Sequence, residues 1–368
     1  MSEPGLTVPR RPSRPVRVGS VLVGGESPIS VQSMTNTDTR DVAATVAQIQ
    51  ALTLAGADLV RLSCPDREAA QAVGSIRSQV TVPLIADIHF DYRLALLALQ
   101  QGVDGLRINP GNIGSRTRVA EVVQAARERR VPIRIGVNAG SLEKDVLARH
   151  GEPCAEAMVE SALHHIRLLE DLDYPEIKIS LKASRVGMTV AAYRLLARQV
   201  DYPLHLGITE AGGLVTGTVK SAIGLGLLLA EGLGDTLRVS LSADPVEEVR
   251  VGFEILKALG LRNRGVNIVS CPTCARQTLP VIDVVSRLEE RLSHIREPVT
   301  VAVMGCVVNG PGEARESAVA LVGGAGGNLF YRDGEPVGKV TDGEALERLV
   351  QEVEAAAARL RQQGAEQT

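Results

Sequence analysis

Between residues 28 and 260 the chain repeats one pattern, in which a short aliphatic run leads through a turn into a segment with helical periodicity. The aliphatic runs are nearly continuous, as in strands that are buried on both faces of a parallel sheet. Amphipathic segments such as DVAATVAQIQALTLAG and RTRVAEVVQAARERR separate the runs. Eight runs occur: SPISVQSMT, ADLVRLSC, VPLIADIHF, DGLRINPGN, VPIRIGVNAG, PEIKISLKAS, YPLHLGITEAG and DTLRVSLSAD. Eight strand–helix units predict a closed (β/α)₈ barrel, of the TIM type.

An open, doubly wound sheet is the alternative fold for such a pattern. It would usually have fewer strands and a glycine fingerprint, G-x-G-x-x-G, after the first strand. No such fingerprint follows SPISVQSMT. The pattern therefore favours the barrel.

Beyond Gly260 the pattern changes to mixed strands and helices: VNIVS, the loop CPTC, LPVIDVVSRLEERLSHI, VTVAVMG, AVALVGG, a hairpin-like stretch and a last long helix. This order predicts a second, small α/β domain. At the other end, MSEPGLTVPRRPSRPVRVGS contains Arg and Pro but no apolar run behind them, unlike a secretory signal. We expect a flexible tail at 1–20, the barrel at 21–262 and the small domain at 263–368.

Composition narrows the possible functions. Apolar residues make up 45% of the chain, but aromatic residues only 2%, without Trp, which disfavours an aromatic platform for single-stranded nucleic acid. The net charge of −3 argues against a general polyanion binder. The longest apolar run, AIGLGLLLA, is shorter than the ~20 residues that span a bilayer. Five Cys, an odd number, fit a reducing compartment. We expect a cytoplasmic protein that binds neither nucleic acid nor membrane.

Basic residues interrupt the aliphatic runs at their centres. Lys182 follows one of these residues, Lys178, by four positions and so lies on the same face of its strand. Side chains near the carboxyl ends of barrel strands converge on the active-site mouth, and Arg forks suit phosphate oxygens. The five central positions are Arg61, Arg107, Arg134, Lys178 and Arg238. Together they predict a site for an anionic, phosphorylated ligand.

The alternative is that these basic side chains form internal ion pairs with Asp58, Asp87 or Asp104, or lie near the lower end of the barrel, away from the active-site mouth. Other polar residues lie close to the same strand ends. Asn109 and Asn138 could donate to the ligand or form turns. Asp87 and His89, two apart, and Glu210, at the end of the seventh run, could transfer protons or hold the basic residues in place.

The cysteines of the second domain have the spacing of metal ligands. Cys271 and Cys274 form a C-x-x-C pair, and Cys306 follows in the loop MGCVVNGPGEARES. Three thiolates fit an iron–sulfur cluster with one iron left for another ligand. They also fit a Cys₃His zinc site with His294, and the C-x-x-C pair alone would fit a redox dithiol. Cys64 and Cys154 are expected to be structural or surface residues.

Nearly the whole chain resembles the 4-hydroxy-3-methylbut-2-enyl diphosphate synthases, in their short two-domain bacterial form. The resemblance rests on SVQSMTNTDT, ADLVRLSCP, LIADIHFDYRLAL, LRINPGNIG, SLKAS, LGITEAGG, CPTCAR and MGCVVNGPGEARES. The last two motifs are highly specific. One departure is visible, ESAVALVGG in place of the usual EADIGIAGG, and it affects no predicted ligand.

The resemblance implies roles for individual residues. Cys271, Cys274, Cys306 and Glu313 would be the ligands of one [4Fe–4S] cluster, in which a carboxylate is held more weakly than thiolates and is the exchangeable ligand. Glu210 and Glu313 would be catalytic, and Asp87 and His89 lie in a matching motif with a less defined role. The diphosphate of the substrate would be bound by Arg61, Arg107, Asn109, Arg134, Asn138 and Lys182.

The resemblance also implies a reaction. The substrate would be 2-C-methyl-D-erythritol 2,4-cyclodiphosphate, opened by two electrons and dehydroxylated to 4-hydroxy-3-methylbut-2-enyl diphosphate in non-mevalonate isoprenoid biosynthesis. Flavodoxin or ferredoxin would supply the electrons. A head-to-tail homodimer would bring the cluster domain of one chain to the barrel of the other. Two other functions compete with this one: a zinc-stabilised barrel that binds a phosphate ligand, and a barrel lyase that forms a Schiff base on Lys182.

Overall fold

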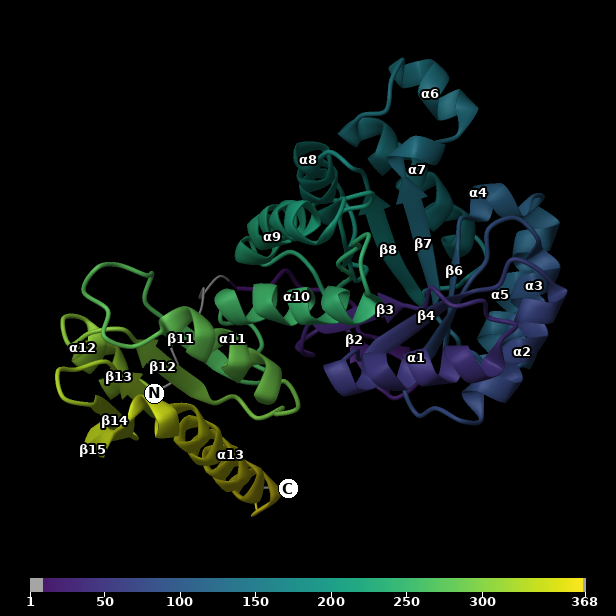
Figure 1. The fold of residues 1–368 in the computed structure, drawn as a ribbon. Coiled ribbons are helices and arrows are strands. Elements are labelled where there is room, and N and C mark those ends of the chain that lie inside the picture. Colours follow the sequence, from purple (N-terminus) through teal and green to yellow (C-terminus); the bar gives the residue numbers. More distant parts are fainter. Residues whose placement is uncertain (1–8, 367–368) are drawn as a thin grey trace. The chain divides into compact units, whose positions relative to one another are not determined.

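The computed structural model describes residues 9–366 of the 368-residue chain. The chain divides into two compact units, Met1–Arg262 and Asn263–Thr368 (Figure 1). Each unit has its own sheet and its own hydrophobic core. We describe them one at a time.

Eight parallel strands form the sheet of the first unit, and they are the eight that the sequence predicts. In chain order they are β3 (Ser30–Met34), β4 (Leu59–Ser63), β5 (Leu84–Asp87), β6 (Gly105–Ile108), β7 (Ile133–Asn138), β8 (Ile177–Lys182), β9 (His205–Leu206) and β10 (Thr236–Leu237). Their order in the sheet is β8-β7-β6-β5-β4-β3-β10-β9, and a parallel bridge between Ile179 and Leu204 joins the two outer strands. The predicted barrel fold is confirmed.

Helices lie outside the strands (Figure 1). Several begin at an Asp whose carboxylate accepts a backbone N–H of the first turn, as Asp41 does for α1 and Asp66 for α2. The helices of this unit are α1 (Val42–Ala55), α2 (Arg67–Arg77), α3 (Tyr92–Gln100), α4 (Pro110–Ile113), α5 (Arg116–Arg129), α6 (Lys144–His150), α7 (Ala155–Glu170), α8 (Val186–Ala197), α9 (Leu214–Ala230) and α10 (Pro245–Ala258), with a 3₁₀ turn, η1, at Ala139–Ser141.

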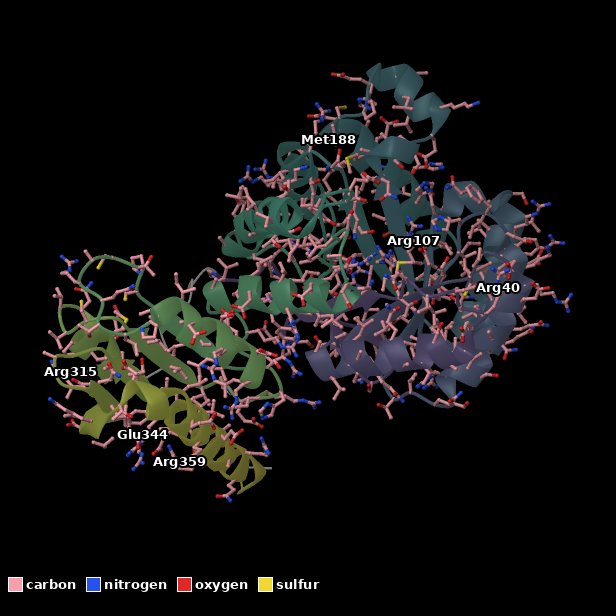
Figure 2. All side chains as sticks on the ribbon, in the orientation of Figure 1. Arg40, Arg107, Met188, Arg315, Glu344 and Arg359 are labelled. Carbon is pink, nitrogen blue, oxygen red and sulfur yellow. The ribbon has the colours of Figure 1, made fainter. Side chains whose placement is uncertain are left out.

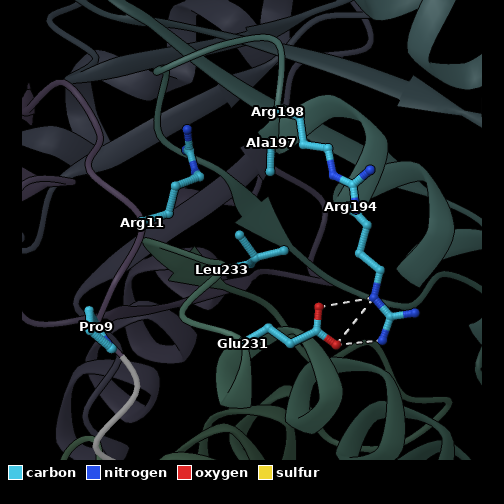
Figure 3. A pocket seen from close by; sticks show the side chains of 7 residues that line it. All are labelled: Pro9, Arg11, Arg194, Ala197, Arg198, Glu231 and Leu233. Atoms are coloured by element: carbon cyan, nitrogen blue, oxygen red, sulfur yellow. Dashed lines mark hydrogen bonds and ion pairs between the residues drawn. The ribbon is translucent and has the colours of Figure 1, made fainter.

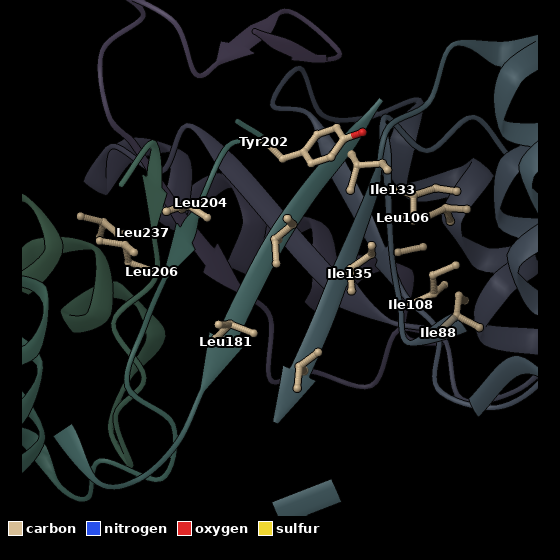
Figure 4. Packing of buried hydrophobic residues seen from close by; sticks show 14 of the residues in the cluster. Ile88, Leu106, Ile108, Ile133, Ile135, Leu181, Tyr202, Leu204, Leu206 and Leu237 are labelled. Carbon is tan, nitrogen blue, oxygen red and sulfur yellow. The ribbon is translucent and has the colours of Figure 1, made fainter. Parts of the chain in front are cut away.

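The strands present aliphatic side chains to the helices and polar ones to the barrel interior. Ile133 and Ile135 on β7 and Leu181 on β8 belong to the buried aliphatic core (Figure 4). Side chains alternate along a strand, so the positions between them, such as Arg134 and Lys178, point the other way. The core between strands and helices is therefore aliphatic, while the interior of the barrel is polar and basic.

A short hairpin closes the amino-terminal end of the barrel. Its strands, β1 (Val16–Val18) and β2 (Val21–Val23), pair antiparallel. Val18 and Val23 pack against Leu59 and Ile85, which lie near the starts of β4 and β5. This apolar cluster fills the barrel at the end opposite the expected active site.

The stretch 1–20, expected to be a flexible tail, is only partly described. Residues 1–8 lie outside the described residues. Residues 9–20, in contrast, are attached to the barrel: the Arg11 guanidinium donates to the carbonyls of Val200 and Tyr202, each at 2.6 Å, and Arg10 pairs with Asp235 at 3.1 Å. Arg10 and Arg11, which the sequence analysis assigned to a flexible tail, therefore form contacts with residues about 190 to 225 positions away in the chain.

The second unit is a five-stranded mixed sheet with helices on both faces, the small α/β domain of the sequence interpretation. Its strands lie in chain order: β11 (Asn267–Ser270), β12 (Thr300–Met304), β13 (Val319–Val322), β14 (Asn328–Arg332) and β15 (Glu335–Val340), the first three parallel and the last two antiparallel. The helices α11 (Val281–Arg291) and α13 (Asp342–Glu366) contribute to one apolar cluster, and α12 (Gly310–Arg315) to another. Among the described residues, no helix is long and apolar enough to cross a membrane.

Candidate functional site

The carboxyl-terminal ends of the barrel strands surround a hollow of about 250 Å³. Arg107 lies inside the barrel (Figure 2). Active sites of (β/α)₈ barrels are built at this face. The lining residues come from β4 to β10 and the loops that follow them: Arg61, Asp87, His89, Arg107, Arg134, Asn138, Ser180, Lys182, Thr209, Arg238 and Ser240.

A larger hollow, of about 600 Å³, lies at the other end of the strands (Figure 3). Its walls include Arg11 and residues at or just beyond the ends of α8 and α9, which lead into β9 and β10. The charges there are partly matched, because Arg194 is paired with Glu231. Its place at the amino-terminal face and its paired charges make it a weaker choice for the active site than the smaller hollow.

Asp87 is the acid at the centre of the smaller hollow. Its carboxylate is 3.2 Å from Nη1 of Arg107, 3.7 Å from Nε of Arg61 and 3.5 Å from Nε2 of His89. Burial on its own would raise the pKa of Asp87, but the charge of Arg61, the hydrogen bond of His89 and the charge of Arg107 hold it far below its usual value. Asp87 is therefore ionised and holds the two arginines in place. Asp58 and Asp104, the two other acids that could have paired with the basic residues of the barrel, have different partners. Asp58 pairs with Arg262, and Asp104 pairs with Arg77.

Three of the six basic side chains inside the barrel have no acidic partner in residues 9–366. Arg61 and Arg107 share Asp87, and Arg238 pairs with Glu248 of α10 at 3.2 Å. The side chains without an ion pair are Arg134, Lys178 and Lys182, which are 1%, 2% and 7% exposed. Since charges without a partner are costly to bury, the barrel interior is built to receive negative charge from a ligand.

Two glycines make room for this basic cluster. A Cβ at Gly136 of β7 would come within 2.6 Å of Nε of Arg107, and one at Gly207, just after β9, within 2.7 Å of Nζ of Lys182. Both positions face the barrel interior. Glycine at these positions leaves room for the long basic side chains, which lie directly against the backbone.

Of the four other polar residues that the sequence analysis predicted for the site, two line the hollow and two do not. Asn138 lines the hollow, whereas Asn109 is the N-cap of α4, accepting the Gly111 N–H at 3.0 Å. His89 lines the hollow just beyond the end of β5 and is half-exposed. Glu210 is an exposed residue of the loop after β9, with φ at +47°, a backbone conformation that is uncommon for a residue with a side chain. Such strain often marks a functional loop.

Ser180, Thr209 and Ser240 also line the hollow, and the sequence interpretation did not include them. Ser180 accepts a hydrogen bond of 2.6 Å from Nη1 of Arg134. Each of the three follows an inward-facing residue by two or four positions. The period of two along each strand was the signal that could have identified them.

The cysteine-containing loops of the second unit follow the carboxyl ends of two adjacent strands of its sheet. Cys271 directly follows β11, and Cys306 comes two residues after the neighbouring parallel strand β12. The Gly305 N–H donates to Sγ of Cys271 at 3.1 Å, so the two loops touch. Cys274 is exposed in the first loop, and Glu313 is exposed on α12, the helix that follows the second. The carboxyl ends of two adjacent parallel strands thus bring the loop of Cys271 and the loop of Cys306 into contact.

The donor set fits an iron–sulfur cluster better than zinc. The predicted donors are three thiols and one carboxylate, and thiolates are the usual ligands of such clusters. His294, the alternative fourth ligand for zinc, follows the end of α11. Because α11 connects two parallel strands, its end lies at the opposite edge of the sheet, where His294 is 3.9 Å from Glu354. In the part of the chain that the structure describes, the His, Cys, Asp and Glu side chains are not gathered into a preformed metal site.

The two remaining cysteines lie in the barrel unit. Cys64 is buried in the aliphatic core, and burial raises the pKa of its thiol to about 12. Cys154 is the N-cap of α7 and accepts the Ala157 N–H. Both positions agree with structural roles.

Comparison with known proteins agrees with this architecture. The family described as the GcpE TIM-barrel domain matches residues 13–253, and the GcpE protein C-terminal domain matches residues 267–355. The 4-hydroxy-3-methylbut-2-en-1-yl diphosphate synthase (flavodoxin) of Magnetococcus marinus is 71% identical over 97% of this chain and 96% of its own. That of Geobacter sulfurreducens is 64% identical over 93% of this chain and 97% of its own. These names give no support to the zinc-stabilised binding module or to the Schiff-base lyase.

The two family matches cover the barrel and the cysteine-bearing unit, and the relatives match at high identity over nearly their full lengths. The resemblance seen in the sequence motifs is therefore confirmed. The chain belongs to the GcpE family of iron–sulfur oxidoreductases, the 4-hydroxy-3-methylbut-2-en-1-yl diphosphate synthases (flavodoxin).

Proposed function

We propose that this protein converts 2-C-methyl-D-erythritol 2,4-cyclodiphosphate into 4-hydroxy-3-methylbut-2-enyl diphosphate. Two electrons enter, the diphosphate ring opens, and one hydroxyl leaves as water after protonation. The observation that carries the proposal is the hollow at the barrel mouth, where buried basic side chains exceed the acids that pair with them. A diphosphate supplies the negative charge that this hollow needs.

The barrel residues would bind and orient the substrate. The side chains proposed to hold its phosphates are Arg61, Arg107, Arg134, Asn138 and Lys182, all of which line the hollow. Asp87 would fix the first two guanidiniums so that their remaining N–H groups point at the ligand. Asn109 would act through the short helix α4 that it caps, since it is not among the residues that line the hollow. Glu210 would be the acid that protonates the leaving hydroxyl, from a loop held in a strained conformation.

Cys271, Cys274, Cys306 and Glu313 would hold one [4Fe–4S] cluster. When bound, the cluster supplies electrons one at a time and Lewis acidity at the iron that lacks a cysteine. Glu313 would be its exchangeable ligand, since a carboxylate binds such iron less firmly than a thiolate. The exposure of Cys274 and Glu313 leaves this side of the unit accessible.

Flavodoxin is the electron donor to expect, because the names of the relatives specify it, and ferredoxin has the same role in the wider resemblance. Both donors are small proteins that carry single electrons at low potential. We also propose that the protein works in the cytoplasm, where such donors occur.

The exposed apolar face of α9 supports the proposal of a homodimer. Val215, Val219, Ile223 and Leu227 follow one another at intervals of four residues, so they lie on one side of the helix, and all are at least 46% exposed. An apolar stripe of this kind usually marks a protein interface. We propose that a second copy of this chain covers it and thereby places its cysteine-bearing unit over the barrel mouth.

Introducing acids into this stripe should dissociate the dimer. We expect Val219→Asp combined with Ile223→Asp to give a monomer by sedimentation and to lower turnover at least about tenfold, an increase of about 1.4 kcal/mol in the barrier. Leu54→Asp, the same type of change at an exposed position of α1, is the control and should leave the assembly intact. A double variant that stays dimeric would remove α9 from the interface.

Lys182→Met tests the substrate site. Removal of one charge-assisted contact costs about 1.5–3 kcal/mol, so the Kd for the cyclodiphosphate should rise about 10- to 150-fold. Calorimetric titration of the protein that retains its cluster measures this, and Lys339→Met, on the exposed strand β15, is the control. An unchanged Kd for Lys182→Met would contradict the assignment of the phosphates to the hollow.

A further inference from the structure

Lys178 belongs to the basic cluster but not to the wall of the hollow. It lies near the start of β8 with Arg134 of β7 as its register partner, and its side chain is 2% exposed. Its Nζ has no hydrogen-bond partner among the described residues. The apolar hairpin cluster closes the barrel below, and the hollow lies above. The amine of Lys178 is thus buried in the barrel interior, between the hairpin cluster and the hollow.

The charged and titratable groups around Lys178 are almost all basic. Asp87 is already shared by two arginines and a histidine, and Glu248 accepts from Arg238. Tyr193 of α8 is engaged with the backbone of Leu181 and His205. The groups that face the barrel interior are Arg61, Asp87, Arg107, Arg134, Lys178, Lys182, His205 and Arg238, with Glu248 behind the last.

Two neighbouring buried cations without an acid are not stable side by side. Arg134 keeps its proton at any physiological pH, because a guanidinium is too basic to lose it. A lysine can become neutral. Burial, and then the charge of Arg134, lower the pKa of Lys178 to about 7, and burial and four arginines lower the pKa of Lys182 well below its usual value. His205 is held neutral in the same way, since burial and the surrounding cations lower its pKa well below its usual value.

A doubly charged ligand would reverse this balance. Negative charge above Arg134 favours the charged form of every amine near it. We infer that Lys178 is a further residue of the ligand site, a positioning residue that is mostly unprotonated at pH 8 in the ligand-free protein and takes up a proton when a diphosphate binds. This inference rests on the proposed function, because it needs the diphosphate in the hollow.

Proton uptake would give the site selectivity that its lining residues alone do not. A ligand with two negative charges favours the charged form of Lys178 more strongly than a ligand with one negative charge does. Since the lysine must gain a proton, affinity should fall as the pH rises from about 7 towards 9. The phosphates of this ligand do not titrate in that range, so any proton taken up on binding is gained by a group of the protein.

Titration calorimetry in two buffers with different ionisation enthalpies counts the protons. With the cluster-containing protein and the cyclodiphosphate at pH 8, we expect uptake of about one proton or more per ligand, because a group with a pKa near 7 is only about 10% protonated there. Lys178→Met should still bind the ligand but take up about one proton fewer. Lys339→Met, on the surface, should behave as the wild type.

The outcomes separate this inference from the proposed function. Binding without proton uptake in the wild type, or uptake unchanged in Lys178→Met, would overturn the role of Lys178 and leave the substrate assignment standing. A wild type that does not bind the cyclodiphosphate at all would instead overturn the proposed function. If Lys178→Met does not fold, the pH dependence of the wild-type Kd decides: a flat profile between pH 7 and 9 would contradict the inference.

Discussion

Cys306→Ser should abolish nearly all turnover, by at least about 100-fold, and strip iron from the purified protein. Loss of a hydrogen-bond partner behind a metal ligand typically costs about 10- to 100-fold in affinity or activity, so loss of a ligand itself should cost at least as much. Cys306 lies beside the Cys271 loop, since the preceding N–H, that of Gly305, donates to the Cys271 sulfur. A serine hydroxyl is a poor replacement for a thiolate at iron. Iron and sulfide analysis and turnover with reduced flavodoxin provide the measurement.

Cys154→Ser is the matched control for this change. Cys154 caps α7 by accepting the Ala157 N–H, and serine is a good N-cap residue. The control should therefore keep its cluster, its stability and its turnover. A Cys306→Ser protein with full iron content and normal turnover would contradict the assignment of the cluster ligands.

Asp87→Asn should lower the free energy of unfolding by about 3–5 kcal/mol, the usual cost of removing one partner from a buried ion pair. Asp87 is 3% exposed and is the only acid that pairs with Arg61 and Arg107 within residues 9–366. Without its charge, two more buried guanidiniums lack a partner. Chemical denaturation gives the measurement, and Asp38→Asn, which breaks an exposed pair with Arg40, should leave the midpoint unchanged.

The pH dependence of the Asp87→Asn effect has a definite sign. The folded-state pKa of Asp87 lies far below its unfolded value, so its stabilisation is present above about pH 4 and is lost as the pH falls below that. The difference between wild type and variant should therefore shrink in acid. Because a bound diphosphate supplies the missing negative charge, the cyclodiphosphate should restore part of the lost stability at pH 7. A difference that stays constant from pH 7 down to pH 2 would contradict the electrostatic account.

The barrel could be predicted because each of its strands is an uninterrupted aliphatic run between turn residues, and the helices between them are amphipathic. The amino-terminal hairpin could not be predicted from the sequence. VRVGSVLV alternates as a strand pair does, but its neighbours are Arg and Pro. The partners of the Arg11 guanidinium lie far along the chain: the carbonyls of Val200 and Tyr202 and the carboxylate of Asp235. Contacts of this kind depend on the closed barrel and leave no local signal.

The basic residues of the site could likewise be read from the strands, because a cation at the centre of an aliphatic run must point inward. The sequence could not show which of these cations are paired, because Asp87 on β5 pairs with Arg61 and Arg107 on the two neighbouring strands. The chemistry of Asn109 was also ambiguous: an asparagine after a strand can contact a ligand or cap a helix, and here it caps α4. The sequence also could not show that His294 lies away from the cysteines, because this follows from the order and direction of the strands in the second sheet.

The most direct test of the account is turnover by the intact protein. After anaerobic purification it should contain about four iron and four sulfide per chain. Given reduced flavodoxin and 2-C-methyl-D-erythritol 2,4-cyclodiphosphate, it should form linear 4-hydroxy-3-methylbut-2-enyl diphosphate, detected by mass and by phosphorus NMR. A colourless protein with one zinc per chain, or a cluster-loaded protein that leaves the cyclodiphosphate unchanged, would contradict it.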